Sequence, residues 1–313
     1  MPRERTLVTG ALGCIGVWTI KALLDRGEEP VGYDLGSDRR RLELILDESE
    51  LARVTLVRGD ITDAEALGRA LDEHETTRVV HLAALQVPFC RADPALGARV
   101  NVLGTVTVFE AVKARLDRIG GLAYASSTAV YNAHDPSPAP ELGGVAPGTL
   151  YGVYKLANEG TARLFWQDEG VPSIGIRPYV VYGPGRDQGM TSGPTLAMES
   201  AARGEAFAIG YGGTVQYDYA ADVGEAFARA SGSTTDGAHV ANFPGVAAPM
   251  EEVVATIEAA APEAAGKITW SPDPLPFPER LESALLEQLV GELPHTPLVE
   301  GVRRTIERFR DAQ

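Results

Sequence analysis

The chain has 313 residues, which is enough for one large domain with a smaller companion and too few for three domains of ordinary size. Its 43 acidic side chains outnumber the 28 basic ones and give a net charge of −15, which excludes the basic surface that nucleic acids and anionic membranes require. The two cysteines, Cys14 and Cys90, have no metal-ligand spacing, and neither a cleavable signal nor a membrane-length apolar run is visible, so we expect a cytoplasmic protein without a bound metal.

Strand and helix patterns alternate along the chain as far as residue 177. The strand patterns are short apolar runs at 6–9, 30–33, 53–57, 78–82, 121–125 and 173–177. Helical patterns lie between them at 17–24, 63–74, 94–116 and 150–168, and later at 195–203, 221–230, 250–260 and 298–310. This alternation predicts an α/β fold with a doubly wound parallel sheet of the Rossmann type. We expect the sheet domain at 1–177 and mainly a smaller C-terminal substrate-binding cap at 178–313, from which 212–245 returns to the sheet domain.

A glycine-rich loop joins the first strand to the first helical pattern. In such a loop the first glycine permits a tight turn, the second lets the backbone approach a pyrophosphate, and the third lets the helix pack close to the sheet. The amides that open the helix favour an anion at the same place. We therefore predict that this loop holds the phosphates of a dinucleotide through Gly10, Leu12, Gly13, Cys14, Ile15 and Gly16.

Asp34 ends the second predicted strand, where a carboxylate can accept hydrogen bonds from both hydroxyls of an adenosine ribose. The same carboxylate repels the 2′-phosphate of NADP, so Asp34 favours NAD as the cofactor. Three arginines at 39–41 follow closely, and they are either part of a solvated helix start or a site for that phosphate. NADP is therefore the less favoured cofactor.

Tyr151 and Lys155 lie four residues apart on a predicted helix, so their side chains share one face. An ammonium group beside a phenol favours the phenolate and lowers the pKa of the phenol. The phenol can then exchange a proton with an alcohol while hydride moves to or from a nicotinamide. Ser127, at the end of the fifth strand, can hold the same substrate oxygen, and Tyr154 lacks the required spacing to Lys155. We predict Ser127, Tyr151 and Lys155 as the catalytic residues.

These features occur together in one protein family. The chain resembles the extended branch of the short-chain dehydrogenases/reductases, the NAD-dependent epimerase/dehydratase family, over roughly its first 185 residues. The matching segments are 9–16, 59–61, 81–84, 101–105, 126–131, the pair Tyr151 and Lys155, and 177–185.

The resemblance implies further cofactor contacts. Asp60 and Ile61 are expected to flank the adenine, and Pro178 and Tyr179 to meet the nicotinamide. Asn101 either contacts the cofactor or anchors its helix by a hydrogen bond. The dinucleotide cleft is expected to be lined by Leu82, Ala83, Ala84 and Ala125, together with Tyr151 and Lys155.

Two departures from the family pattern bear on the substrate. Dehydratases of the family carry an acid pair directly after the catalytic hydroxyl residue, where this chain has Thr128 and Ala129, so we do not expect a dehydratase. Nucleotide-sugar epimerases place an arginine on the diphosphate where this chain has Tyr217, and only Arg280 remains as a second clamp in the region 272–281. A diphosphate without an arginine partner binds poorly, which points away from nucleotide sugars.

The residues expected to face the substrate are less regular. Arg186 either pairs with a substrate carboxylate or phosphate or forms a salt bridge within its loop. Gln86 either touches a substrate hydroxyl or stabilises its loop. We include as substrate residues Gln86, Ser127, Thr128, Arg186 and Tyr217.

The sequence as a whole predicts an NAD-dependent enzyme that moves hydride to or from a secondary alcohol of a sugar or sugar-acid type small molecule. The same residues serve an epimerase, which keeps and re-reduces the ketone, and a dehydrogenase, which releases it. One alternative is a nucleotide-sugar 4-epimerase with an atypical diphosphate site, and another is a dinucleotide sensor without catalysis. By the resemblance, a homodimer would form through the helices at 94–116 and 150–168.

Overall fold

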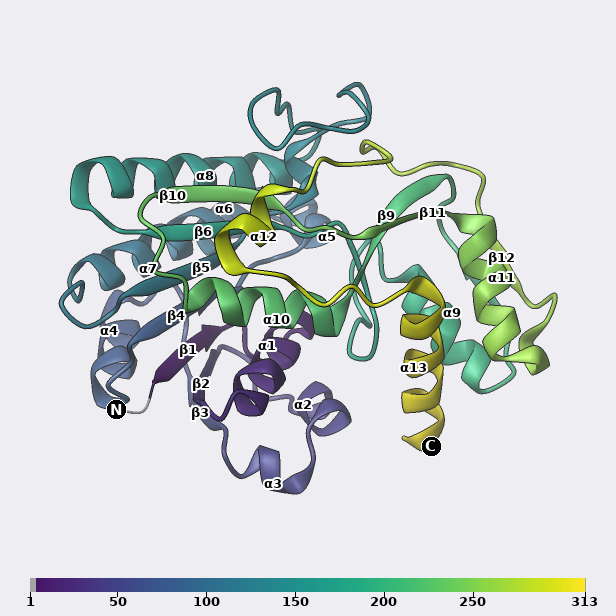
Figure 1. The fold of residues 1–313 in the computed structure, drawn as a ribbon, viewed down its shortest axis with the longest axis horizontal. Helices are drawn as coiled ribbons and strands as arrows, with labels where there is room; N and C mark the ends of the chain where they lie inside the picture. The colour runs from purple at the N-terminus through teal and green to yellow at the C-terminus, as the bar shows by residue number, and fades with distance from the viewer. Residues whose placement is uncertain (1–3, 313) are drawn as a thin grey trace.

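A seven-stranded parallel sheet forms the centre of the computed structural model, which describes residues 4–312 (Figure 1). Its strand order is β10-β6-β5-β4-β1-β2-β3, and every neighbouring pair is parallel. The strands are β1 (Arg5–Thr9), β2 (Glu29–Asp34), β3 (Thr55–Arg58), β4 (Arg78–His81), β5 (Gly121–Ala125), β6 (Ser173–Arg177) and β10 (Ala238–Asn242). The predicted Rossmann-type fold is confirmed.

Helices cover both faces of this sheet because successive strand side chains point to opposite sides. Val8 and Val80 face one apolar cluster, whereas their neighbours Leu7 and Val79 face another. The first cluster packs under α1 (Cys14–Asp25), α2 (Arg40–Ile45), α10 (Ala220–Ser231) and α12 (Leu285–Val290). The second packs under α4 (Ala64–Glu73), α7 (Gly104–Lys113) and α8 (Leu150–Glu169).

The helical segment at 94–113 is continuous but not regular. It consists of α6 (Pro94–Ala98), a π-helical turn (Arg99–Leu103) and α7. Contrary to expectation, this one segment among residues 4–312 is long and apolar enough to cross a membrane by length and composition. Half of it is buried inside the structure, and the core helix of a soluble protein meets the same criteria.

The C-terminal part of the chain divides between the large sheet and a smaller unit. Within 212–245, α10 packs on α1 and β10 extends the large sheet, but β9 (Thr214–Tyr219) belongs to a small sheet in the order β11-β9-β7. Helix α9 packs against α13 beside this small sheet (Figure 1). The remaining elements of this unit and its connections are β7 (Val180–Tyr182), α9 (Gly193–Ala202), β8 (Phe207–Ile209), β11 (Val246–Pro249), α11 (Met250–Ala260), β12 (Ile268–Trp270) and α13 (Leu298–Asp311).

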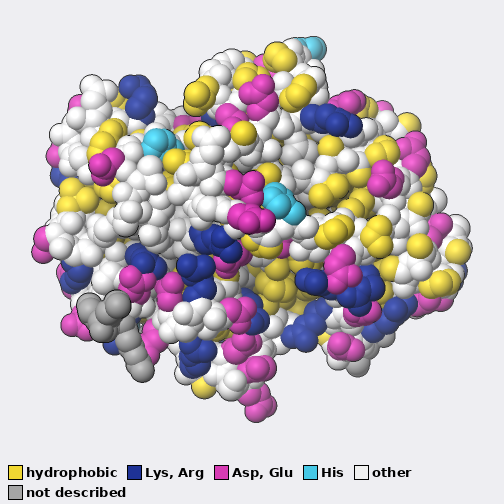
Figure 2. Space-filling model, in the orientation of Figure 1, with side chains coloured by type: hydrophobic (Ala, Val, Ile, Leu, Met, Phe, Trp, Pro, Cys, Tyr) yellow, Lys and Arg dark blue, Asp and Glu magenta, His cyan; other side chains and the backbone are white. Residues whose placement is uncertain are grey.

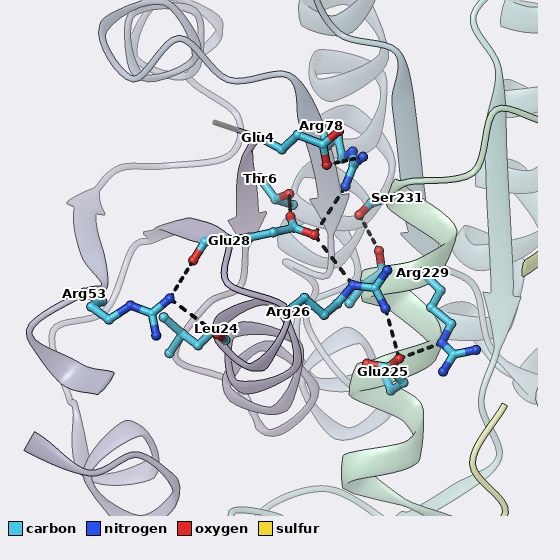
Figure 3. A network of polar contacts seen from close by, with 11 residues as sticks. Glu4, Thr6, Leu24, Arg26, Glu28, Arg53, Arg78, Glu225, Arg229 and Ser231 are labelled. Carbon is cyan, nitrogen blue, oxygen red and sulfur yellow. Dashed lines mark hydrogen bonds and ion pairs between the residues drawn. The ribbon is translucent and has the colours of Figure 1, made fainter. Parts of the chain in front are cut away.

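A polar network fastens α10 to the sheet at the end where the strands begin (Figure 3). Glu28 accepts hydrogen bonds from Thr6 at 3.1 Å and from Arg78 at 3.3 Å. Arg26 bridges Glu28, at 3.6 Å, and Glu225 of α10, at 3.2 Å. A late segment of the chain is thereby held to the first two strands, at the end of the sheet away from the carboxyl ends of the strands.

Two short helices, α3 (Glu48–Leu51) and α5 (Val87–Ala92), complete the connections near the sheet. The strand order reverses direction between β1 and β4, and ligands of open α/β sheets bind outside the carboxyl ends of the strands at such a switch point. The glycine loop and the segment after β4 meet at this place, so the topology puts the candidate site there.

Candidate active site

The glycine loop has the tight geometry that its sequence predicts. Gly10 has a φ angle of +67°, and a Cβ atom on it would lie 2.7 Å from the backbone nitrogen of Ala83. A Cβ atom on Gly16 would lie 2.2 Å from the carbonyl oxygen of Gly10. Helix α1 begins at Cys14, so the amides of its first turn, which have no intrahelical partner, open toward the loop.

Asp34 is held at the adenosine end of the site. Its carboxylate accepts hydrogen bonds from the amides of Leu12 at 3.0 Å and Gly36 at 2.9 Å, which leaves acceptor capacity for ribose hydroxyls. Arg41 pairs with Asp187 at 2.6 Å and donates to the Leu12 carbonyl at 2.9 Å, while Arg40 pairs with Asp38 at 2.8 Å. These arginines are engaged by protein groups, which agrees with NAD rather than NADP.

A cleft of about 700 Å³ runs from Asp34 past the glycine loop to the end of β5. This volume fits a dinucleotide, and the absence of a side chain at Gly10, Gly13 and Gly16 leaves room for its phosphates. The predicted cofactor residues that line the cleft are Gly10, Leu12, Gly13, Cys14, Ile15, Gly16, Asp34, Asp60, Ile61, Leu82, Ala83, Ala84, Ala125, Tyr151, Lys155, Pro178 and Tyr179.

Asn101 does not line this cleft, which corrects the expectation of a cofactor contact. The residue is buried in the π-helical turn, and its side chain bonds the amide of Leu85 at 2.7 Å and the carbonyl of Leu85 at 2.9 Å. Asn101 therefore anchors the loop after β4, which carries the cleft-lining residues Ala83 and Ala84. The anchoring alternative accounts for this asparagine.

Ser127, Tyr151 and Lys155 meet at the end of β5. Helix α8 begins at Leu150, capped by Thr149, so Tyr151 and Lys155 occupy its first two turns. The ammonium nitrogen of Lys155 lies 5.6 Å from the centre of the Tyr151 ring and donates to the carbonyl of Ala125 at 2.7 Å. Ser127 hydrogen-bonds the Tyr151 phenol. Tyr154 instead donates to the Pro94 carbonyl at 2.8 Å.

Burial dominates the electrostatics of this group. It lowers the pKa of Lys155 to about 8 and raises the pKa of Tyr151 above its usual range. The hydrogen bond from Ser127 and the positive charge of Arg186 partly offset the rise in the Tyr151 pKa. The sequence predicted a lowered pKa of Tyr151 because of Lys155. In the structure burial raises this pKa, and the cation that opposes the rise is Arg186.

A buried ion pair holds the helix that carries Tyr151 and Lys155 against the sheet, and it was not predicted from the sequence. Arg177 on β6 pairs with Glu159 on α8 through bonds of 2.7 Å, and both side chains are less than one-tenth exposed. Glu159 also accepts from Ser126, and Arg177 donates to Tyr131 at 2.6 Å. Because a buried charge needs its partner, this pair fixes α8 against β6 and the end of β5.

A second buried carboxyl holds the segment expected to meet the nicotinamide. Asp218 is fully buried and accepts a hydrogen bond from the backbone amide of Tyr179 at 2.6 Å. Burial raises the pKa of Asp218 to about 8. The Tyr179 ring packs edge-on against Phe277, and its hydroxyl donates to Pro278 at 2.9 Å.

Four of the five predicted substrate residues line the cleft, and one does not. Gln86, Ser127, Thr128 and Arg186 line it. Tyr217 is 1% exposed, packs edge-on against Tyr182, and belongs to the apolar core of the smaller unit. The expectation that Tyr217 faces the substrate is therefore wrong, because its strand turns this side chain inward.

Other residues of the cleft were not predicted from the sequence. The loop after β7, of which only Arg186 was predicted to face the substrate, also contributes Gly185, Asp187 and Thr191, and Phe277 enters from a segment far along the chain. The turn residues at 183–185 are the local signal that marks the rest of this loop. No local signal marks Phe277, because only tertiary contact with Tyr179 brings it to the cleft.

Comparison with known proteins places the chain in a family. A sequence profile of the NAD dependent epimerase/dehydratase family matches residues 6–242. A UDP-glucose 4-epimerase of Mycolicibacterium smegmatis is 32% identical, with 98% of this chain and 99% of the relative covered. A UDP-glucuronate 4-epimerase 6 of Arabidopsis thaliana is also 32% identical, but the match covers 57% of this chain and 40% of that protein.

Solved structures share the fold over nearly the whole chain. The UDP-glucose 4-epimerase of Thermus thermophilus, solved in complex with NAD, is 28% identical with a TM-score of 0.84, and 99% of this chain and 100% of that chain are covered. The L-threonine dehydrogenase of Clostridium difficile shares the fold, with a TM-score of 0.81 at 20% identity over 99% of this chain and 98% of that chain.

Proposed function

The chain belongs to the NAD dependent epimerase/dehydratase family, and from this premise we propose that Ser127, Tyr151 and Lys155 catalyse hydride transfer between NAD and a secondary alcohol of a carbohydrate-like substrate. The observation that carries the proposal is the meeting of these three side chains at the end of the dinucleotide cleft. NAD, when bound, supplies the acceptor and donor of hydride.

The protein residues manage the proton and the position of the substrate. In the oxidising direction the carbon–hydrogen bond gives up hydride, the hydroxyl proton passes to the phenolate form of Tyr151, and the alcohol becomes a ketone. Burial disfavours this phenolate, and Ser127 and the charge of Arg186 favour it. Ser127 donates a hydrogen bond to the same oxygen and keeps it at the phenol. Lys155, held by the Ala125 carbonyl at 2.7 Å, places a positive charge beside Tyr151.

The arrangement supports redox chemistry without loss of water. Thr128 and Ala129 follow Ser127, and neither can act as the acid or base of an elimination at neutral pH. If the ketone stays bound and is reduced on its other face, the net reaction is epimerisation. If the ketone leaves, the net reaction is that of a dehydrogenase.

A nucleotide-sugar 4-epimerase is the second candidate function. The whole-length similarity to a UDP-glucose 4-epimerase favours it. Such a substrate would need a diphosphate site of a different kind, because Tyr217 lies in the core and Arg280 is exposed outside the cleft lining.

The test is to incubate UDP-sugars, free sugars and sugar acids with the enzyme and NAD. Absorbance of NADH indicates a dehydrogenase, and an epimer seen by NMR without free NADH indicates an epimerase. Tyr151→Phe is expected to lower kcat/KM by about 100- to 10,000-fold while NADH still binds, because the proton acceptor is lost.

Tyr154→Phe is the matched control, since it removes a phenol from the same helix that bonds Pro94 outside the site. Full activity of Tyr151→Phe would refute the mechanism. Tight NADH binding without turnover of any substrate would favour a sensing role instead.

We extend the proposal to the organisation of the protein. Residues 1–177 hold mainly the cofactor, and 178–313 supply mainly the substrate wall. The protein acts in the cytoplasm as a homodimer, and large apolar side chains exposed on α6, the π-helical turn and α8 support this assembly. They are Leu96, Leu103, Val153 and Leu164.

A further inference from the structure

Arg186 is a cation of the cleft without an anionic partner. Its Nη2 atom donates to the Thr191 hydroxyl at 3.1 Å, and its buried Nε atom has no hydrogen-bond partner. Among residues 4–312, no carboxylate forms an ion pair with Arg186. The three other cations of the cleft lining have polar partners. Arg40 pairs with Asp38, Arg41 pairs with Asp187, and Lys155 donates to the Ala125 carbonyl.

Gln86 presents a second unsatisfied polar group beside this guanidinium. Gln86 precedes α5, lines the cleft, and has a buried side-chain oxygen without a hydrogen-bond partner. A Cβ atom on Gly189 would lie 2.2 Å from that oxygen and 3.1 Å from Nη2 of Arg186, so both groups surround the same glycine. Gly189 has a φ angle of +105°, which favours glycine and keeps this space free of a side chain.

This pair of polar groups lies within reach of the reacting centre. Arg186 and Gln86 line the same cleft as Ser127 and Tyr151. The charge of Arg186 acts on the Tyr151 phenol and lowers its pKa against the effect of burial. A guanidinium charge that lines a cleft without an anionic partner costs free energy, and an anion that pairs with it recovers this cost.

We propose that Arg186 and Gln86 form a subsite in which Arg186 binds a carboxylate of the substrate and Gln86 binds a neighbouring hydroxyl, while Tyr151 and Ser127 hold the reacting hydroxyl. The guanidinium fork matches a carboxylate, and the unpartnered oxygen of Gln86 can accept a hydrogen bond from a hydroxyl beside that carboxylate. The inference rests on the proposed hydride-transfer function and narrows its substrate class to sugar acids.

One unpaired guanidinium suits a singly charged group better than a diphosphate. A diphosphate would bring a second charge for which this part of the cleft, within the described residues, offers no further free cation. The excess of acidic residues makes a local positive partner more necessary for any anionic substrate.

The test compares matched acids and neutral sugars: gluconate and glucuronate against sorbitol and glucose, with UDP-glucose as a third class. The wild-type enzyme is expected to prefer an acid by about 100-fold or more in kcat/KM. Arg186→Gln is expected to lower kcat/KM for that acid by about 100-fold and kcat/KM for neutral substrates by a clearly smaller factor, since loss of the Arg186 charge also raises the pKa of Tyr151. Arg186→Lys should recover only part of the loss, because it keeps the charge but not the fork.

A binding measurement separates this subsite from the chemistry. Each acid is titrated into the enzyme–NADH complex, with NADH fluorescence as the signal, for wild type, Arg186→Gln, Gln86→Leu and the control Arg203→Gln. Arg203 pairs with Glu199 and Glu205 outside the cleft. Equal affinity of wild type and Arg186→Gln for the acids, or a higher kcat/KM of the wild type for UDP-glucose than for both acids, would overturn the subsite.

The two proposals fail in different ways. If Tyr151→Phe abolishes turnover of neutral and acidic substrates alike and Arg186→Gln spares both, the function stands and the subsite does not. If acids bind through Arg186 but Tyr151→Phe keeps full turnover, the proposed mechanism falls and the subsite stands.

Discussion

At the scale of single residues, Asp218 shows how burial can change the chemistry of one carboxyl group. The side chain lies in the core and accepts one hydrogen bond, from the Tyr179 amide, while its other oxygen has no partner. Desolvation therefore raises its pKa to about 8, and the nearby Asp222 contributes in the same direction. The group is protonated in the folded protein at neutral pH, although it would be ionised in the unfolded chain.

The sign of the resulting pH dependence follows from linkage. A carboxyl whose pKa is raised by folding stabilises the protein below its unfolded pKa, near 4, and this contribution is lost as the pH rises toward 8. Asp218→Asn keeps the acceptor for Tyr179 but cannot ionise.

We expect wild type to lose stability relative to Asp218→Asn between pH 5 and 8, by up to about 1.4 kcal/mol per pH unit. Urea unfolding of both proteins without cofactor at several pH values measures this difference. Parallel stability profiles of the two proteins would contradict the prediction.

At the scale of elements, the loop after β7 is tied across the cleft to the first helices. Arg41 on α2 joins Asp187 of this loop to the carbonyl of Leu12 in the glycine loop. Trp18 on α1 donates to the carbonyl of Pro184 at 2.9 Å. The loop that carries Arg186 is therefore held beside the expected site of the pyrophosphate, which links cofactor binding to the substrate wall.

Loosening this connection is expected to speed release of the cofactor. Asp187→Asn removes the partner of Arg41, and because the pair is partly exposed we expect only about a 3- to 10-fold higher Kd for NADH. Fluorescence titration gives the Kd for NADH, and stopped-flow fluorescence gives the rate at which NADH dissociates from the enzyme. Lys21→Gln is the control, since Lys21 pairs with Asp25 and Glu50 outside the cleft; an equal change in both variants would argue against a specific role of the loop.

At the scale of the whole molecule, the distribution of charge bears on nucleic-acid binding, and the exposed apolar surface bears on assembly into a dimer. Acidic and basic side chains are interspersed on the face shown in Figure 2, so no broad basic surface for nucleic acid appears on it. Large apolar side chains remain exposed on α8 and on the π-helical turn that packs against it: Leu164 is 45% exposed and Leu103 is 49% exposed. Exposed apolar surface of this kind is typical of an interface between subunits.

We expect the wild type to have twice the chain mass of 33.2 kDa in light scattering after size exclusion. Leu103→Glu combined with Leu164→Glu should give the monomer mass, because burying two carboxylates in an apolar interface is unfavourable. Val299→Glu changes an exposed residue of α13 and should leave the mass unchanged. A wild type that elutes at the monomer mass would refute the dimer.

The sequence by itself determined the features that depend on short spacings. The glycine loop, Asp34 at the end of a strand and the Tyr151–Lys155 pair each lie within one turn, strand or helix, so local geometry alone defines them. The strand and helix order as far as residue 177 also followed, because strands buried on both faces of a parallel sheet are continuous apolar runs, whereas the helices that cover them repeat their apolar residues every three or four positions. The comparisons with known proteins confirm the family and NAD as the cofactor, both of which were predicted from these local features.

Tertiary structure alone decided the positions at which the sequence-based expectations failed. Asn101 bonds Leu85 and Tyr217 turns into the core, whereas Phe277 meets Tyr179 from a distant segment. The regular helix predicted at 94–116 contains a π-helical turn at Asn101, whose side chain bonds the loop after β4. These outcomes depend on contacts between residues far apart in the chain, and no local pattern encodes such contacts.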